Sequence, residues 1–114
     1  MSDCLFCKIR DGQISADLVY QDDRAIAFRD INPQAPLHVL IVPRDHIPTL
    51  NDLTPAHNEL VGHLFQVAAH IARDQGVATS GYRCLFNCNK EAGQTVWHIH
   101  LHVLGGRHLG WPPG

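Results

Sequence analysis

The sequence predicts an α+β fold, in which a five-stranded antiparallel sheet carries one long helix and one short helix. The chain has 114 residues, 45% of them hydrophobic, which suits one domain (1–114) with a core of its own. Five short segments have strand character, and a single long segment has helical spacing. Because no secretory signal or membrane-length apolar run is visible, we expect a cytoplasmic protein that binds no membrane. The formal charge of −2 excludes a basic nucleic-acid-binding surface.

The first elements are a short helix and a hairpin. Asp3 is a candidate cap for a helix over residues 4–11, which Gly12 ends. A polar turn joins the first two strands into a hairpin. The expected strands span residues 17–20, 25–30, 37–42, 82–88 and 97–104.

The long helix is expected to begin at Thr54 and Pro55, a hydroxyl cap followed by proline, and to end at Gly76. Its apolar residues follow helical spacing and predict a buried stripe: Leu60, Val61, Leu64, Val67, Ala68, Ile71 and Ala72. The tail 105–114 is too rich in glycine and proline for regular structure.

The last strand alternates histidine with apolar residues. Period two places Trp97, Ile99, Leu101 and Val103 on a core face, and it places His98, His100 and His102 on the other face. Neighbouring histidines on one face lie ~6.7 Å apart, too far for all three to bind one ion without strain. Divided roles are therefore expected, and the alternative is a solvated histidine face without function.

This run resembles the signature of the histidine-triad superfamily. Three further segments and the tail are similar to its Hint branch, the phosphoramidases: Asp30-Ile-Asn-Pro-Gln-Ala-Pro-Leu-His38, Val42-Pro-Arg-Asp-His46, Gly93-Gln-Thr-Val-Trp-His98 and Trp111-Pro-Pro-Gly114. Histidine rather than glutamine at position 102 argues against the nucleotidylyltransferase branch, and the tail argues against the dinucleoside-polyphosphate hydrolases. The resemblance implies the HIT-like fold and a homodimer.

The resemblance also implies a reaction, hydrolysis of the P–N bond of a purine nucleoside 5′-phosphoramidate through a nucleotidyl-histidine intermediate. His100 is the expected nucleophile, since a neutral imidazole can attack phosphorus when its other nitrogen is held as a donor. By resemblance, His102 contacts the phosphate and His38 completes a relay beside the nucleophile. His98 belongs either to this relay or to a metal site, and catalysis itself needs no metal.

The substrate contacts follow from the same resemblance, with AMP-like purine nucleotides as the ligands. Asp30 matches an acidic residue on the ribose hydroxyls, Asn87 matches a phosphate-contacting asparagine, and Gln94 lies in the same loop. Thr95 stands where the family has a serine near the leaving group, which can shift the preference among amines. The base is expected to bind among five apolar side chains: Leu5, Phe6, Ile9, Phe28 and Ile31. Each of these, taken singly, would be an ordinary core residue. Trp111 of either subunit is expected to cover the leaving group.

Cys4 and Cys7 form a CxxC motif. No strand precedes it, as a thioredoxin-like motif would require, and no signal favours a secreted disulfide. The remaining interpretation is that the two cysteines are two of the four ligands of a structural zinc site. Bacterial histidine-triad proteins with this motif complete the site with two histidines, which correspond here to His46 and His98.

The remaining cysteines and histidines are expected to be bystanders. Cys84 and Cys88 are small buried residues in this interpretation, while His57, His63 and His70 lie on the solvated face of the long helix, and His108 has no assigned role. Two other functions stay open. One is hydrolysis of dinucleoside polyphosphates or adenylyl sulfates, and the other is a non-catalytic, zinc-stabilised module that binds nucleotides or a partner.

Overall fold

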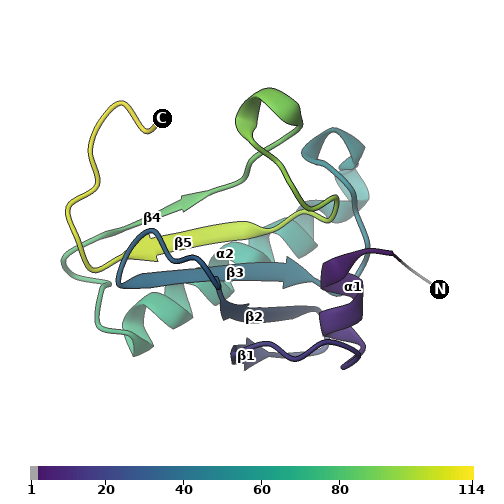
Figure 1. The fold of residues 1–114 in the computed structure, drawn as a ribbon, viewed down its shortest axis with the longest axis horizontal. Helices are drawn as coiled ribbons and strands as arrows, with labels where there is room; N and C mark the ends of the chain where they lie inside the picture. The colour runs from purple at the N-terminus through teal and green to yellow at the C-terminus, as the bar shows by residue number, and fades with distance from the viewer. Residues whose placement is uncertain (1–2) are drawn as a thin grey trace.

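A computed structural model describes residues 3–114 and contains an antiparallel sheet of five strands in the order β1-β2-β3-β5-β4 (Figure 1). The strands are β1 (Leu18–Gln21), β2 (Ala25–Arg29), β3 (Leu37–Pro43), β4 (Tyr82–Leu85) and β5 (Leu101–Gly105). The helices are α1 (Leu5–Arg10) and α2 (Asn58–Asp74), with short 3-10 turns at Leu50–Asp52, Pro55–His57 and Lys90–Ala92. The predicted α+β class is confirmed. Within residues 3–114, no helix has the length and apolar character needed to cross a bilayer.

The two helices cover opposite faces of the sheet (Figure 1). α2 buries its apolar stripe against one face, where Val39 and Ile41 of β3 are fully buried. α1 packs on the other face, where Phe6 joins Leu40 and Val42 of the same strand. Because side chains alternate along a strand, β3 serves both cores, and every one of its residues is buried.

The pairing of β3 with β5 places the histidines on the α1 side. Leu40 lies opposite His102 in the register, and His38 shares a face with Leu40 two residues away. The antiparallel direction also brings the loop after β3 beside the segment that leads into β5, as the sequence predicts. The Nδ1 atoms of His46 and His98 are consequently 3.2 Å apart.

Both helices begin at positions that differ from the predicted ones. The cap of α1 is Cys4, whose sulfur accepts a hydrogen bond from the main-chain N–H of Cys7 at 3.4 Å, while Asp3 is exposed. The segment after Thr54 first makes a 3-10 turn, in which Nδ1 of His57 accepts from the Thr54 main chain at 2.9 Å, and α2 starts at Asn58.

The last strand is shorter than its sequence pattern. Residues 98–100 approach β5 outside the regular ladder, with a main-chain hydrogen bond of 2.8 Å from Ile99 to Ile47. Trp97 is 48% exposed, so its predicted place in the core is wrong. The solvated histidine face is also wrong, because His98 and His100 are only 0% and 7% exposed.

β4 is shorter than predicted as well, and its cysteines are less alike than expected. The strand ends at Leu85, so Cys88 lies beyond it rather than on the same strand face as Cys84. Both are half-buried, and Cys84 packs against the core under α2, where burial raises the pKa of its thiol.

His63 of α2 is a structural residue rather than a solvated one. Its Nε2 lies 2.7 Å from a carboxylate oxygen of Asp22 in the β1–β2 turn. Asp22 also accepts from the Tyr20 hydroxyl at 2.7 Å and from the main-chain N–H groups of Arg24 and Ala25 at 2.7 and 2.8 Å. Burial alone would raise the pKa of Asp22, but these hydrogen bonds hold it below its ordinary value. The carboxylate therefore clamps the hairpin to α2.

Replacing Asp22 with alanine should destabilise the protein. The substitution leaves several half-buried donors without their acceptor, and we expect the free energy of unfolding to fall by about 2 kcal/mol. Urea denaturation followed by circular dichroism measures it. Asp23→Ala, at the exposed neighbouring carboxylate, is the matched control and should change stability by less than about 0.5 kcal/mol. Equal stabilities of the two variants would contradict the clamp.

Candidate active site and metal-binding cluster

A cavity of about 760 Å³, here called the main cavity, lies on the α1 side of the sheet. Its walls come from α1, from β2 and the loop after it, and from the loop that leads to β5. Ten of the residues expected at the substrate line it: Leu5, Phe6, Ile9, Phe28, Asp30, Ile31, Asn87, Thr95, His100 and His102.

Main-chain carbonyl groups fix which ring nitrogens of His98 and His100 carry a proton. Nδ1 of His100 lies 2.9 Å from the carbonyl oxygen of His98, and Nε2 of His98 lies 2.7 Å from the carbonyl oxygen of Pro43. A carbonyl only accepts, so both of these nitrogens donate. In the neutral rings, Nε2 of His100 and Nδ1 of His98 therefore keep their lone pairs.

His38 and His102 are joined by hydrogen bonds whose donors and acceptors can be assigned. The main-chain N–H of Gln34 donates to Nδ1 of His38 at 3.0 Å, which leaves the proton of a neutral ring on Nε2. That nitrogen lies 2.9 Å from Nδ1 of His102 and donates to it. The proton of His102 is then on Nε2, a buried atom with no hydrogen-bond partner among the described residues. A buried N–H without an acceptor lowers the stability of the folded protein, which suggests that a bound ligand accepts this hydrogen bond.

Burial keeps these imidazoles neutral. It lowers the pKa of His38 and of His100, and it lowers the pKa of His102 to about 4, with help from His100 and His38. The carboxylate of Asp30 opposes this trend, and one of its oxygens lies 3.6 Å from Nε2 of His38. The carboxylate is held in turn by the main-chain N–H of Asn32 at 2.8 Å.

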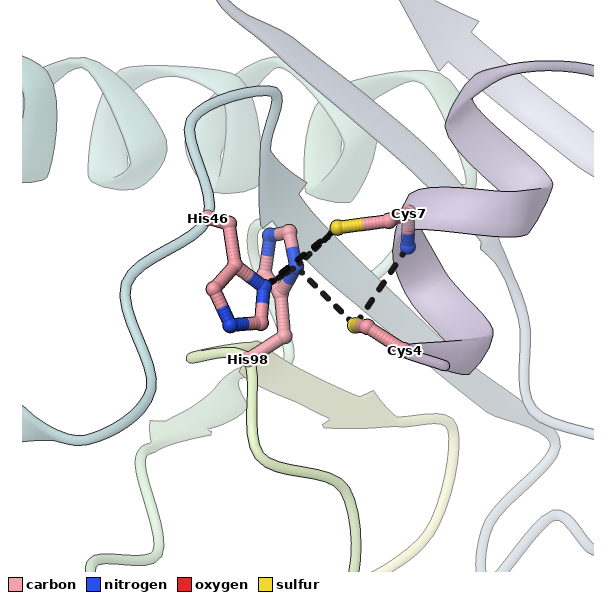
Figure 2. A group of neighbouring side chains, drawn as sticks. All are labelled: Cys4, Cys7, His46 and His98. Atoms are coloured by element: carbon pink, nitrogen blue, oxygen red, sulfur yellow. Dashed lines mark hydrogen bonds between the residues drawn. The ribbon is translucent and has the colours of Figure 1, made fainter. Parts of the chain in front are cut away.

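The four predicted metal ligands converge (Figure 2). The sulfur of Cys4 lies 3.4 Å from Nδ1 of His98, and the sulfur of Cys7 lies 3.3 and 3.5 Å from Nδ1 of His46 and His98. A tetrahedral ion with Zn–N bonds of ~2.0–2.1 Å and Zn–S bonds of ~2.3 Å separates its ligands by roughly 3.3–3.8 Å. The His98 nitrogen that faces the cluster is also the one with the free lone pair. The cluster can therefore bind a metal ion.

A second group of metal-ligating residues, Asp30, His38 and His102, has a different explanation. The nitrogens of His38 and His102 are 2.9 Å apart, closer than two ligands of a tetrahedral ion and typical of a hydrogen bond. A proton between the two rings explains this distance better than a metal ion.

Two expected substrate contacts lie elsewhere in the structure. Main-chain groups of two loops satisfy the Gln94 amide, which accepts from the N–H of Asn89 at 2.8 Å and donates to the carbonyls of Pro48 and Val96 at 2.8 and 3.1 Å. It shapes the loop that presents Thr95 instead of lining the main cavity. Trp111 is 84% exposed and does not line the main cavity of its own chain.

Sequence reasoning also missed part of the lining. Leu40 could have been found, because it follows His38 by two residues on one strand and shares its face. The loop between α1 and β1 carried no such signal, since its position depends on tertiary packing. The additional lining residues are Ile14, Ser15, Ala16, Asp17, Arg29, Leu40, Gly93 and Val96.

Comparison with known proteins places this geometry in a family. A family model described as the HIT domain matches residues 11–109. The chain belongs to the histidine-triad (HIT) family. This HIT chain is 52% identical over 106 residues to the Escherichia coli (strain K12) protein named purine nucleoside phosphoramidase, and the match covers 93% of this chain and 89% of the relative.

Solved structures of HIT proteins have the same fold. The HIT family hydrolase from Legionella pneumophila Philadelphia 1 matches with a TM-score of 0.97 at 50% identity, over 98% of this chain and 100% of that chain. A histidine triad protein from Clostridium difficile matches with a TM-score of 0.93 at 42% identity, over 96% of each chain. The predicted family and fold are confirmed, and the names of these relatives agree with the predicted hydrolase.

The low pKa of His102 predicts a loss of stability in acid. The unfolded chain takes up this proton near pH 6.5 but the folded chain only near pH 4, so the free energy of unfolding should fall as the pH is lowered through that window. His102→Gln removes the titrating group. The slope of its unfolding free energy against pH should therefore be smaller than that of the wild type, by an amount equivalent to at most about one bound proton. Urea unfolding of both proteins across this window, with a chelator present to exclude metal effects, measures the slopes. Identical slopes would contradict the assignment.

Proposed function

We propose that this HIT protein hydrolyses the P–N bond of purine nucleoside 5′-phosphoramidates. The observation that carries the proposal is the buried His100, whose Nδ1 is held by the His98 carbonyl at 2.9 Å. This bond directs the lone pair to Nε2 of a residue that lines the main cavity. The name of the Escherichia coli relative, at 52% identity, supports the same reaction.

In the first step, Nε2 of His100 attacks the phosphorus in line with the leaving amine. A bond forms between Nε2 and phosphorus, the P–N bond to the amine breaks, and the amine leaves with an added proton. The amine takes that proton from solvent, and the N–H of His102, which has no other partner among the described residues, donates a hydrogen bond to the phosphoramidate. In the second step, water attacks phosphorus, the bond between phosphorus and Nε2 of His100 breaks, and the proton that the water loses returns to solvent.

The polar residues of the main cavity have separate tasks. In this proposal, Asn87 donates to a phosphoryl oxygen, the Thr95 hydroxyl lies near the leaving amine, and Asp30 accepts from the two ribose hydroxyls. The Asp30 carboxylate, 3.6 Å from Nε2 of His38, also stabilises the positive charge that the His100 ring acquires when its Nε2 bonds to phosphorus. The apolar wall formed by α1 and Phe28 holds the base.

The metal ion in the Cys4, Cys7, His46 and His98 cluster is, in this proposal, zinc. Two thiolates and two imidazoles at tetrahedral separations are typical of a structural zinc site. The Pro43 carbonyl, 2.7 Å from Nε2 of His98, would orient this ligand from outside the metal shell. Zinc would supply stability and no chemical step. Reduced thiols of this kind fit the reducing cytoplasm.

The protein is further proposed to be a homodimer. β4 is an edge strand of the sheet, and next to it the rings of Phe65 and Phe86 lie 6.1 Å apart with Phe65 44% exposed. An edge strand beside the exposed ring of Phe65 suits a second copy of the chain. The exposed Trp111 would then be available to the partner's cavity.

Substitution of His100 tests the function directly. We expect His100→Ala to lower kcat/KM for adenosine 5′-phosphoramidate by about 10³-fold or more, because it removes the nucleophile. His70→Ala, an exposed histidine on α2, is the control and should keep wild-type activity. Wild-type protein should cleave diadenosine polyphosphate far more slowly than the phosphoramidate.

Other outcomes of this assay have distinct meanings. Full activity of His100→Ala on either substrate would refute the assignment of His100 as the nucleophile. Turnover of the diadenosine compound alone would favour the alternative hydrolase. AMP binding without turnover of either substrate would favour a non-catalytic module.

Elemental analysis tests the zinc proposal. Purified wild-type protein should contain zinc close to one ion per chain, and Cys4→Ser and His46→Ala should lose it. Both variants should lose stability, with a smaller loss of activity than His100→Ala causes. Cys84→Ser is the control and should retain the metal, because Cys84 packs in the core on the other face. A wild-type protein that takes up no zinc would rule the site out.

A further inference from the structure

We infer that metal binding at the Cys4, Cys7, His46 and His98 cluster and nucleotide binding in the main cavity strengthen each other through α1. Cys4 and Cys7 are then positioning residues for the nucleoside, although neither is expected to touch the reacting atoms. The inference rests on the proposed function, since it assumes that both ligands bind.

α1 belongs to both sites. Cys4 caps the helix and Cys7 lies in its first turn, so both thiols face the metal cluster. Three other residues of the same helix, Leu5, Phe6 and Ile9, line the main cavity. Both sets of side chains belong to the same six-residue helix and its cap, and a movement that displaces the thiols therefore also displaces the cavity wall.

Besides the metal cluster, side-chain packing and a hydrogen bond to the loop after β3 hold α1 in place. Helices this short are not stable on their own in water. Arg10 donates to the carbonyl of Arg44 at 2.7 Å near the end of the helix, and Phe6 packs into the smaller core. Metal bonds from the two thiols to the ion that His46 and His98 also ligate would fasten the helix at its N-terminal end. Without the ion, the sulfur–nitrogen contacts of 3.3–3.5 Å are weaker hydrogen bonds.

Phe6 connects the cluster to the reacting residue. Its ring contacts His98 and His100 edge to face, with centroids 6.1 and 5.0 Å away, and it packs against Phe28 of the cavity wall at 5.4 Å. Loosening α1 therefore disturbs the nucleoside wall first. The hydrogen bond that holds His100 comes from the main chain of His98 and not from α1, so we expect the metal to change KM more than kcat.

The coupling must act in both directions. If the metal raises the affinity for the nucleotide by some factor, the nucleotide raises the affinity for the metal by the same factor. A second cavity of about 560 Å³, lined by Cys4, His46 and Trp97 among others, adjoins the cluster. A chelator can therefore reach the ion in the folded protein, which makes the metal affinity measurable.

The test uses the zinc-loaded protein and AMP. Zinc affinity is measured by competition with a chromophoric chelator, with and without saturating AMP, and we expect AMP to raise it about five-fold or more. Calorimetry should show AMP binding weakened by the same factor in metal-free protein. Cys4→Ser/Cys7→Ser should bind AMP as the metal-free protein does. Cys84→Ser/Cys88→Ser is the matched control and should retain the full coupling, and kinetics should show the larger change in KM.

The outcomes separate this inference from the function beneath it. Zinc and AMP affinities that do not depend on each other would overturn the coupling and leave the proposed function intact. Failure to bind AMP would refute the proposed function, failure to bind zinc would refute the proposed metal site, and either result would overturn the inference as well. If metal-free protein unfolds, any coupling between zinc and AMP would arise from folding of the whole chain and not from α1, which would also overturn the inference.

Discussion

The hydrogen bonds of His98 connect the two sites of this protein. Its Nε2 donates to the carbonyl of Pro43 at 2.7 Å, which turns the lone pair of Nδ1 toward Cys4, Cys7 and His46. Its own carbonyl accepts from Nδ1 of His100 at 2.9 Å, which turns the lone pair of that ring toward the main cavity. One fully buried residue thus prepares a metal ligand with its side chain and a nucleophile with its main chain.

Burial keeps the neighbouring imidazoles neutral, as the reaction requires. A protonated His100 has no lone pair on Nε2, and a protonated His102 would disrupt the relay, so both must be neutral to react. Burial lowers the pKa of each ring, while the nearby Asp30 carboxylate remains available to stabilise the positive charge on His100 when its Nε2 bonds to phosphorus. The histidines are thus neutral before the substrate binds, and the Asp30 carboxylate stabilises positive charge when the substrate reacts.

The sequence predicted the fold and most of the site because alternation and helical spacing are local signals. Period two placed His102 and His38 on one side of their strands, and antiparallel pairing then brought His46 to His98. The role of Gln94 was not predictable, because it depends on three partners in folded loops. His63 was misjudged for a similar reason, since a polar side of a helix does not reveal that Asp22 lies opposite. The proton positions in the rings also depend on carbonyl groups that only the fold provides.

The most direct test of the account is to trap the covalent intermediate. Wild-type protein mixed with adenosine 5′-phosphoramidate is quenched within one turnover, digested and examined by mass spectrometry under conditions that preserve phosphorus–nitrogen bonds. The account predicts one added adenylyl group on the peptide that contains His98, His100 and His102, with fragmentation placing it on His100, and none in His100→Gln. An adenylyl group on another residue, or turnover without any labelled peptide, would contradict it.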